Sequence, residues 1–450
     1  MSADPPAAKR SIGRLATKLS QLVRALPLGN RLAGDAAVYV GATVINAAIP
    51  FLLLPFLTRW LPPGEFGLVA LFLAQINVLQ VLIGLGAHGM ISVAYFREGP
   101  DAMPPQAGAA LGIVVTMAST AWIGSLLIAA RLEAFSGIPA DWLWLVVLAS
   151  AGQCGIAVAL AIFQTLRQPY RFAAVQIGFA LCMSGTALIS IGLFHSGWIG
   201  RALAQGLAAG CVSVVALGWL TRRGAVSWNV RRWPVRAALS FGLPLLPHSL
   251  GGVVIASIDR FALTGAAGSI AVGKYFVAQQ ISSVLLVLGA ALSQAWSPWL
   301  FERLSKGGEE DHRQVVQVAT AAVLLLLAGG LSLAVLAPIV IAVVAGANYG
   351  DSVGVLRILG PAYAFVGSYY FVTGFLFYER RTGLLSAITI SVAVIQAALS
   401  FSLARIGGIV GVAYATLISY ALYFALTWFA ASRVHPLSWR RFLVRRDHSA

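Results

Sequence analysis

The sequence contains few charged residues and few cysteines for its length. Asp, Glu, Lys and Arg together make up 10% of the 450 residues, whereas soluble domains carry about 25%. So few charges cannot cover a soluble surface, which excludes an ordinary soluble globular protein. The three cysteines lie in apolar runs without CxxC spacing. That pattern excludes a disulfide framework and is typical of small buried hydrophobic residues.

Signatures of catalysis and of bound cofactors are also missing. The sequence has no Gly-rich phosphate-binding loop ending in Lys and no other ATPase signature, so we expect neither ATP hydrolysis nor a cofactor. The apolar runs do not alternate in segments of about 10 residues, which excludes a transmembrane β-barrel. The longest loop predicted outside the membrane, around 264–275, is too short for a catalytic domain.

Long apolar runs are what the sequence has in abundance. Hydrophobic residues make up 59% of the chain, and many runs approach the roughly 20 residues that a spanning helix needs. The sequence therefore predicts an all-α polytopic membrane protein with about twelve transmembrane helices. We expect them at 36–58, 66–90, 108–130, 142–164, 172–194, 202–220, 240–263, 276–300, 316–345, 353–378, 383–404 and 409–431.

The basic residues predict the orientation of these spans. With the N-terminus inside, 24 of the 31 Lys and Arg residues fall in the tails and inner loops, as the positive-inside rule requires. This distribution accounts for the net charge of +16 without nucleic acid as a partner. The remaining seven fall outside or in the upper membrane: Arg59, Arg131, Arg201, Arg260, Lys274, Arg357 and Arg405.

Loops and tails divide the chain into five parts. Residues 1–35 form a basic cytoplasmic tail, in which apolar residues at helical spacing over 9–26 predict an amphipathic helix on the inner leaflet. A six-helix bundle over 36–220, a basic cytoplasmic linker over 221–239 and a second bundle over 240–431 follow. Residues 432–450 form a second basic cytoplasmic tail.

The two halves resemble each other. "EFGLVALFLAQINVLQVLIGLG" (65–86) is similar to "AVGKYFVAQQISSVLLVLGAAL" (271–292), which aligns Gly67 with Gly273, 206 residues later. An even number of spans in each half gives both halves the same orientation. We therefore expect parallel repeats around a central cavity, an arrangement that transporters use for a substrate site between rocking halves.

Polar residues inside the apolar runs are the candidate site. Intramembrane charges are costly, so they usually face a cavity or a partner, and a cationic cleft would suit a phosphate or pyrophosphate. Simpler roles stay open: snorkelling of the basic residues, pairing of the aspartate with its neighbour, and a histidine bonded to a carbonyl. The candidates are Arg59, His248, Asp259, Arg260, Lys274 and Arg357.

Prolines mark the first helix of each half. Pro50 and Pro55 lie in the first span, and Pro244 and Pro247 lie near the start of the seventh. Proline removes a backbone donor and kinks or breaks a helix, which membrane proteins tolerate where the backbone lines a cavity or is buried in protein. We therefore expect both helices to be interrupted and to line the cavity, with ordinary kinked packing as the alternative.

These motifs resemble a known family. The chain is similar to bacterial polysaccharide-transport proteins, the Wzx-type lipid-linked oligosaccharide (O-antigen) flippases of the multidrug/oligosaccharidyl-lipid/polysaccharide flippase superfamily. The resemblance covers about 36–430 and implies charged cavity or gate residues at Arg59, Asp259, Arg260 and Arg357. The matching stretches are "FLTRWLPPGEFG" (56–67), "SFGLPLLPHSL" (240–250), "IDRFAL" (258–263) and "AVGKYFVAQQI" (271–281).

The resemblance implies a transporter rather than an enzyme. It would flip an undecaprenyl-pyrophosphate-linked glycan from the cytoplasmic to the periplasmic leaflet of the bacterial inner membrane, with both termini cytoplasmic. Its partners would be membrane lipids and polysaccharide polymerase or export machinery. A drug antiporter of the same superfamily would need a proton-exchanging carboxylate, for which only Asp259 is well placed. A membrane-embedded polymerase or ligase is the third alternative.

Overall fold

The computed structural model describes residues 30–228 and 232–436. The amphipathic helix predicted over 9–26 lies outside the described residues. Long α-helices dominate the described part: α2 (Asn30–Trp60), α3 (Pro63–Gly84), α4 (Gly89–Glu98), α5 (Met103–Leu127), α6 (Ala129–Ser136), α7 (Leu143–Thr165), α8 (Pro169–Gly192), α9 (Gly197–Arg222), α10 (Arg232–Lys306), α11 (Glu309–Val335), α12 (Ala337–Val344), α13 (Ser352–Tyr378) and α14 (Thr382–Val434).

Glycine kinks divide the two longest helices. Within 30–228 and 232–436, 10 helices are long and apolar enough to cross a membrane. Two of these helices each consist of two helical segments joined at a kink. The kink in α10 lies at Gly268 (φ 75°, ψ 179°), and the kink in α14 lies at Gly408 (φ 52°, ψ −133°). Only glycine adopts such backbone angles without strain. The kinks bring the described crossings to twelve, which confirms the predicted all-α polytopic fold.

Several predicted boundaries differ from the structure. The loop expected at 264–275 is absent from the described chain, because α10 stays helical on both sides of Gly268. Alanine is the best helix former, and alanines stand on both sides of the break, so both arms stay helical up to Gly268. The chain changes direction at that one residue. The span predicted over 66–90 ends at Gly84 and resumes as α4. The span predicted over 316–345 ends at Val335, before the short α12.

The four prolines do not interrupt their helices, contrary to our expectation. Pro50 and Pro55 lie inside α2, and Pro244 and Pro247 lie inside the first arm of α10, residues 232–267. Pro244 and Pro247 are exposed, and Pro50 and Pro55 are half-buried. Neighbouring polar groups and local adjustment can compensate for the missing donor in spanning helices. The interruption of α10 comes instead at Gly268.

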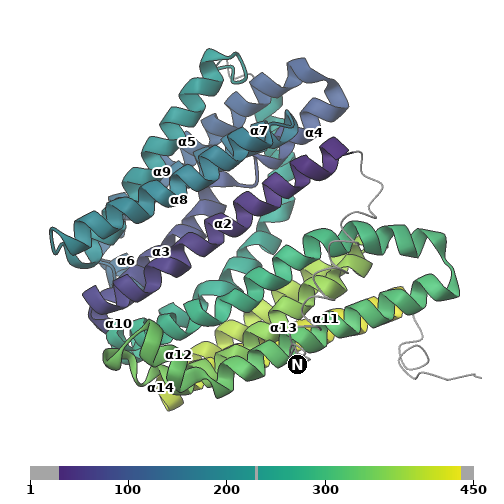
Figure 1. Ribbon diagram of the computed structural model, residues 1–450. Helices are drawn as coiled ribbons and strands as arrows, with labels where there is room; N and C mark the ends of the chain where they lie inside the picture. Colours follow the sequence, from purple (N-terminus) through teal and green to yellow (C-terminus); the bar gives the residue numbers. More distant parts are fainter. Residues whose placement is uncertain (1–29, 229–231, 437–450) are drawn as a thin grey trace, which may run out of the picture.

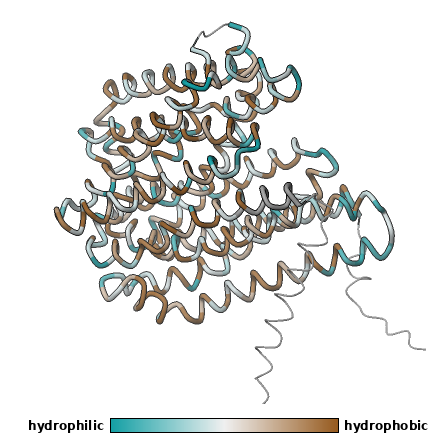
Figure 2. Tube along the Cα trace, turned by 45° about the horizontal axis from the view of Figure 1, so that its top comes forward, coloured by the Kyte–Doolittle hydropathy of each residue, from teal (hydrophilic) through white to brown (hydrophobic). Residues whose placement is uncertain are grey.

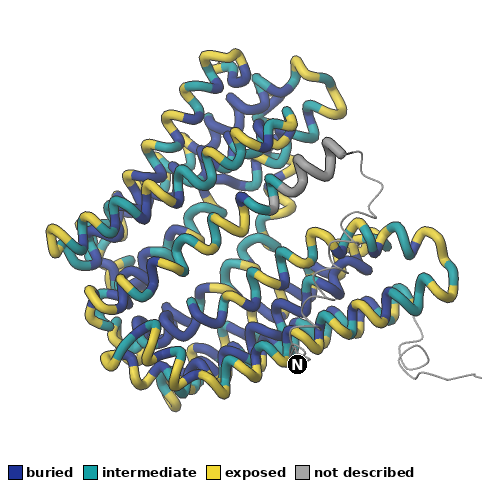
Figure 3. Tube along the Cα trace, in the orientation of Figure 1, coloured by how far each residue is buried: buried dark blue, intermediate teal, exposed yellow. Residues whose placement is uncertain are grey.

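The helices form two bundles, α2 to α9 and α10 to α14 (Figure 1). We call the end with Gly268, Gly408 and α12 the kink side, and the end with the turns 98–103, 165–169, 222–228 and 306–309 the linker side. The bundles meet at the kink side, and α11 to α14 diverge from α2 to α9 toward the linker side (Figure 1). The start of α10, by contrast, stays against α3, α4 and α5 at the linker side. The most buried stretches run through the bundle interiors (Figure 3), and hydrophilic residues gather in the turns (Figure 2).

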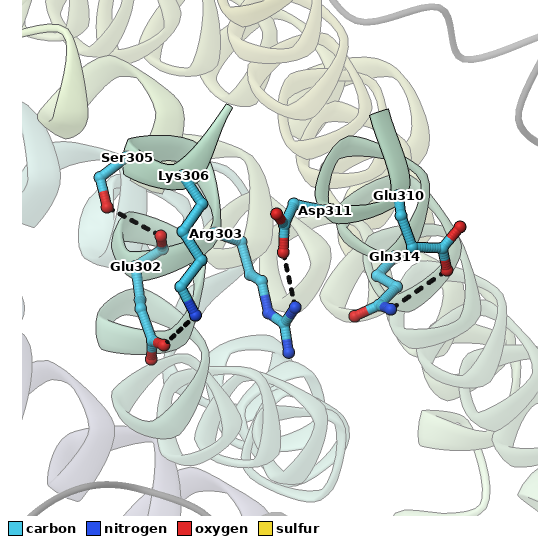
Figure 4. Close-up of polar contacts among 7 residues, drawn as sticks. All are labelled: Glu302, Arg303, Ser305, Lys306, Glu310, Asp311 and Gln314. Atoms are coloured by element: carbon cyan, nitrogen blue, oxygen red, sulfur yellow. Dashed lines mark hydrogen bonds and ion pairs between the residues drawn. The ribbon is translucent and has the colours of Figure 1, made fainter. Parts of the chain in front are cut away.

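Ion pairs fix the linker-side turn between α10 and α11 (Figure 4). Arg303 Nη1 lies 2.5 Å from Asp311 Oδ1, across the turn. Lys306 pairs with Glu302 one helical turn away, with Nζ 2.6 Å from Oε1. The acidic first turn of α11 also complements the positive N-terminal end of that helix. The positive charge predicted for the inner loops is therefore partly neutralised at this turn.

Candidate functional site

Two glycines make a close crossing between the bundles at the kink side. A Cβ added to Gly67 of α3 would lie 1.9 Å from the Ser269 carbonyl oxygen, and one added to Gly273 of α10 would lie 1.8 Å from the Pro63 oxygen. Pro63 and Ser269, like Gly67 and Gly273, are 206 positions apart. Each half thus presents equivalent positions to the other, as in a two-fold contact. This symmetry supports the repeat found in the sequence.

Further contacts surround this crossing and complete the kink-side seal. Thr58 Oγ1 donates to the Val344 carbonyl at 3.0 Å, and the Tyr349 hydroxyl donates to the Leu61 carbonyl at 3.0 Å. Burial raises the pKa of the Tyr349 phenol, so it stays a neutral donor. The Phe66 ring packs on those of Phe276 and Tyr349. The seal joins α2 and α3 to α10, α12 and the turn before α13.

A cavity of about 440 Å³ lies between α3, α5, α7 and the first arm of α10. We call it the linker-side cavity. Its polar side chains are Asn77, Gln80, His88 and Ser249, and its lining contains no Arg, Lys, Asp or Glu among the described residues. Gly84, Gly86 and Gly252 keep part of the wall free of side chains. The cavity is therefore polar but carries no fixed charge.

A second cavity of about 230 Å³, the kink-side cavity, lies between α2, α3, α8, α9 and the second arm of α10 (269–306). Most of its wall is apolar, but Arg201 of α9 lines it together with Asn46, Gln205 and Gln280. Arg201 is 6% exposed, and its Nη1 donates to Gln205 Oε1 at 3.1 Å. Its Nε has no hydrogen-bond partner in the described structure.

No carboxylate lies within ion-pair distance of Arg201 among the described residues, and none lines its cavity. A buried cation without a counter-ion is costly, so such a residue usually serves a ligand. Glu65 of α3 lies at the start of α9, where its Oε2 accepts the Trp198 backbone N–H at 2.9 Å. Arg201 thus gives the kink-side cavity an uncompensated positive charge.

One face of α3 borders both cavities. Phe66, Val69 and Leu73 line the kink-side cavity, and Asn77, Gln80 and Gly84 line the linker-side cavity. These residues recur at intervals of three and four, so they form one stripe. From Phe66 to Gly84 the stripe runs about 27 Å along the helix. The stripe therefore connects the mostly apolar kink-side cavity, which contains Arg201, to the uncharged polar linker-side cavity.

The residues predicted from the sequence lie elsewhere. Arg59 is exposed at the seal, where its Nη2 donates to the Val343 carbonyl at 3.1 Å. Lys274 forms an ion pair with Asp351 at the kink-side surface. Arg357 is exposed on α13 and makes no polar contact within the described residues. His248 is half-buried on α10 beside the linker-side cavity, and its Nδ1 has no partner.

Asp259 and Arg260 lie inside the C-terminal bundle. Arg260 donates from Nε and Nη2 to Gln279 Oε1 at 3.1 and 2.9 Å, and Gln279 Nε2 donates to Asp259 Oδ2 at 3.0 Å. The guanidinium also lies 4.8 Å from the centre of the Phe276 ring. This network joins the two arms of α10 beside its kink. The structure therefore does not bring the six predicted residues into one chamber, because Arg260 is satisfied within its own bundle.

Replacing Gln279 with leucine is expected to lower the free energy of unfolding by about 2–4 kcal/mol, because it leaves the buried Arg260 guanidinium without a hydrogen bond and removes one hydrogen bond to Asp259. Thermal unfolding of the purified protein in detergent measures the effect. Gln294→Leu is the matched control, since Gln294 is exposed on the same helix. Equal melting temperatures for the two variants would show that the network contributes no stability.

The cavity residues Asn77, Gln80, His88, Ser249 and Arg201 were not among the predicted site residues. For Arg201, the sequence did contain a feature that indicates burial. Arg201 and Gln205 are four residues apart on α9 among many alanines and glycines, and small residues allow helices to pack closely in membranes. A polar pair on such a helix is therefore buried between helices. For the amides, no sequence feature separates a cavity position from ordinary interhelical hydrogen bonding.

Comparison with known proteins assigns the family. A family model described as "Polysaccharide biosynthesis protein" matches residues 32–304, which include α3, most of the cavity-lining residues and almost all of α10. This chain belongs to the polysaccharide biosynthesis protein family. The match confirms the resemblance that the sequence motifs indicated.

Two relatives of this family member come from Haemophilus influenzae. One, an "uncharacterized membrane protein", is 23% identical over 285 residues, which cover 61% of this chain and 66% of the relative. The other, "Lsg locus putative protein 1", is 24% identical over 281 residues, which cover 60% and 66%. The match thus spans slightly less than two thirds of each relative's length.

Solved structures show the fold of this polysaccharide biosynthesis protein. Lipid II flippase MurJ, in an inward closed conformation, is similar with a TM-score of 0.71 and 12% identity, covering 88% of this chain and 87% of that chain. An inward-facing multidrug resistance MATE family transporter of the MOP superfamily has a TM-score of 0.69 and 17% identity, covering 91% and 100%. The described chain is therefore a multi-pass membrane protein with the fold of these transporters.

Proposed function

We propose that this protein flips an undecaprenyl-pyrophosphate-linked oligosaccharide from the cytoplasmic to the periplasmic leaflet of the bacterial inner membrane. The observation that carries the proposal is Arg201, a buried cation without a carboxylate partner in a cavity between the two bundles. Guanidinium groups bind phosphate oxygens bidentately and retain their charge when buried. Family membership supports a role in polysaccharide biosynthesis.

The shape of the structure supports alternating access as the mechanism. The seal closes the kink side, and α11 to α14 diverge from α2 to α9 toward the linker side (Figure 1). The excess of basic residues in the loops and tails favours a cytoplasmic linker side and cytoplasmic termini. A conformation of this kind would admit cargo from the cytoplasmic leaflet. Release would follow when the bundles rock and the kink-side seal opens.

The proposal treats the protein as a carrier and not as an enzyme. Catalysis would require positioned acid, base or nucleophile pairs, and the cavity linings offer a single arginine, one histidine and uncharged groups. Membrane lipids would surround it, and the flipped product would pass to polysaccharide polymerase or export machinery. These partners follow from the proposed pathway.

A reconstituted translocation assay tests the proposed function. Proteoliposomes containing the purified protein receive lipid-linked oligosaccharide extracted from producing cells, and an impermeant lectin or glycosidase reports its leaflet over time. We expect protein-dependent transfer of the glycan without added nucleotide. Transfer rates equal to those of protein-free vesicles would contradict the proposal. Gly265→Ala serves as the control variant, because a Cβ added at Gly265 would meet no atom within 4 Å and should not affect transport.

A drug antiporter is the second candidate, favoured by one observation. Asp259 is a buried carboxylate within a bundle, and a multidrug transporter shares the fold. Its carboxylate, however, accepts the Arg260 backbone N–H at 2.8 Å and the Gln279 amide, and it lines neither cavity. Uptake of a lipophilic cation by the same proteoliposomes under a pH gradient, lost in Asp259→Asn, would support this alternative.

A further inference from the structure

We propose that the linker-side cavity is a subsite for the carbohydrate part of the cargo, and that this carbohydrate is uncharged. This inference rests on the proposed function and deepens it. It assigns the two ends of a lipid-linked glycan to different cavities. The phosphate would bind at Arg201, and the sugar rings would bind at Asn77, Gln80, His88 and Ser249.

Unused hydrogen-bonding capacity is the first argument. The side chains of Asn77, Gln80, His88 and Ser249 make no hydrogen bond within the described residues, although all four line the same cavity. Two amides, a hydroxyl and an imidazole offer donors and acceptors together. A ligand with many hydroxyl groups satisfies such a mixed set, because each hydroxyl both donates and accepts. Sugar rings have this chemistry.

The absence of fixed charge is the second argument. The lining includes no Lys or Arg among the described residues, so an anionic sugar such as a uronic acid would lose its hydration without gaining a counter-ion. The lining includes no carboxylate either, so a cationic amino sugar would meet the same cost. The cavity therefore favours neutral sugars.

Size and shape are the third argument. A volume of about 440 Å³ lies within the usual range of small-molecule sites, about 300–1,000 Å³. The apolar wall, which includes Val81, Val114 and Val158, can pack against the C–H faces of sugar rings. A Cβ added to Gly252 meets nothing within 4 Å, so this position leaves room for the ligand.

The stripe on α3 is the fourth argument. It continues from the kink-side cavity to the linker-side cavity without a change of helix face, so one extended molecule could contact both. Leu73 and Asn77, where the lining changes from apolar to polar, are about 6 Å apart along the helix. A phosphate bound at Arg201 and sugars bound at Gln80 would lie on the same side of α3.

Transport kinetics with two lipid species test the assignment. The translocation assay gives KM for the native lipid-linked oligosaccharide, and competition gives the inhibition constant of sugar-free undecaprenyl pyrophosphate. In Asn77→Leu/Gln80→Met, KM is expected to rise about tenfold or more, since each lost hydrogen bond weakens binding severalfold. The inhibition constant of the sugar-free lipid should stay within about twofold. Gln294→Met is the control for folding, because Gln294 is exposed and lines neither cavity.

A second variant blocks the cavity without removing a polar group. Gly252→Leu should raise KM for the glycosylated lipid by about tenfold as well, while Gly218→Leu, at an open position on α9, should change nothing. Chemical analysis of the transported glycan should find neutral sugars only.

Three results would overturn the inference. They are unchanged KM in both cavity variants, an equal rise in KM and in the inhibition constant of the sugar-free lipid, and a transported glycan that carries uronic acids. In each case wild-type transport would leave the proposed function standing. Absence of glycan transport by the wild-type protein would instead reject the proposed function, and the sugar subsite with it.

Discussion

Replacing Arg201 with glutamine is expected to reduce translocation of lipid-linked oligosaccharide about 100-fold. The variant removes the buried cation of the kink-side cavity but keeps a polar side chain beside Gln205. Hydrogen bonds to charged groups contribute about 1.5–3 kcal/mol, which corresponds to about 10–100-fold in affinity. Single-turnover transport and competition by sugar-free undecaprenyl pyrophosphate measure the loss, and both should weaken together.

Stability separates this role of Arg201 from a purely structural one. Removal of an unpaired buried charge should leave the melting temperature unchanged or raise it, whereas loss of a structural residue would lower it. Arg201→Lys should restore part of the activity, because it restores the charge without the planar fork. Arg405→Gln, at an exposed position on α14, is the matched control. Full transport by Arg201→Gln would remove the arginine from the mechanism.

Replacing Gly273 with leucine is expected to reduce transport at least tenfold by preventing closure of the kink side. Its Cβ would lie 1.8 Å from the Pro63 carbonyl oxygen, and backbone atoms cannot move aside as a flexible side chain can. Overpacking of this kind costs about 1–3 kcal/mol or more, and separating the bundles is the simplest relief. The seal would then stay open.

Distance measurements between spin labels show whether the seal opens. Trp60 of α2 and Ile270 of α10 are exposed at the kink side, so cysteines there can carry labels once Cys154, Cys182 and Cys211 are replaced. In Gly273→Leu the distance distribution should shift to longer values and transport should fall at least tenfold. Gly265→Leu, where a Cβ meets nothing within 4 Å, should match the parent. An unchanged distribution with normal transport would show that the crossing tolerates a side chain.

The number of spans could be predicted from the sequence because hydrophobic length is a local property. Each crossing needs about 20 apolar residues, and this requirement holds whatever the neighbouring helices do. The ends of the spans were harder to predict. Gly268 and Gly408 reverse the chain within one residue, but other glycines, such as Gly251 and Gly252, stay helical. Which glycine bends depends on packing that the sequence does not display.

The family was also predictable, because three of its four motifs flank the α2–α3 turn or the Gly268 kink, where backbone geometry restricts the residues. The positions of the charges relative to the cavities were not. Arg260 and Arg201 both lie in apolar runs, yet Arg260 contacts Gln279 and the Phe276 ring, whereas Arg201 lines a cavity and its Nε has no partner. Depth along a helix follows from residue number, but the direction of a side chain depends on how the helices are rotated. Arg357 shows the same limit, since it is exposed.

The reciprocal contact of Gly67 with Ser269 and of Gly273 with Pro63 constrains how this lineage can diverge. A larger residue in place of either glycine would overlap with the main chain of the opposite half. A compensating change there would have to move that main chain away. Homologues with a bulkier residue at position 67 or 273 should therefore carry altered residues at the position that it contacts in the other half, 269 or 63. An alignment should show that the two contacting positions covary. Such covariation is expected if the two halves arose by duplication of one ancestral gene.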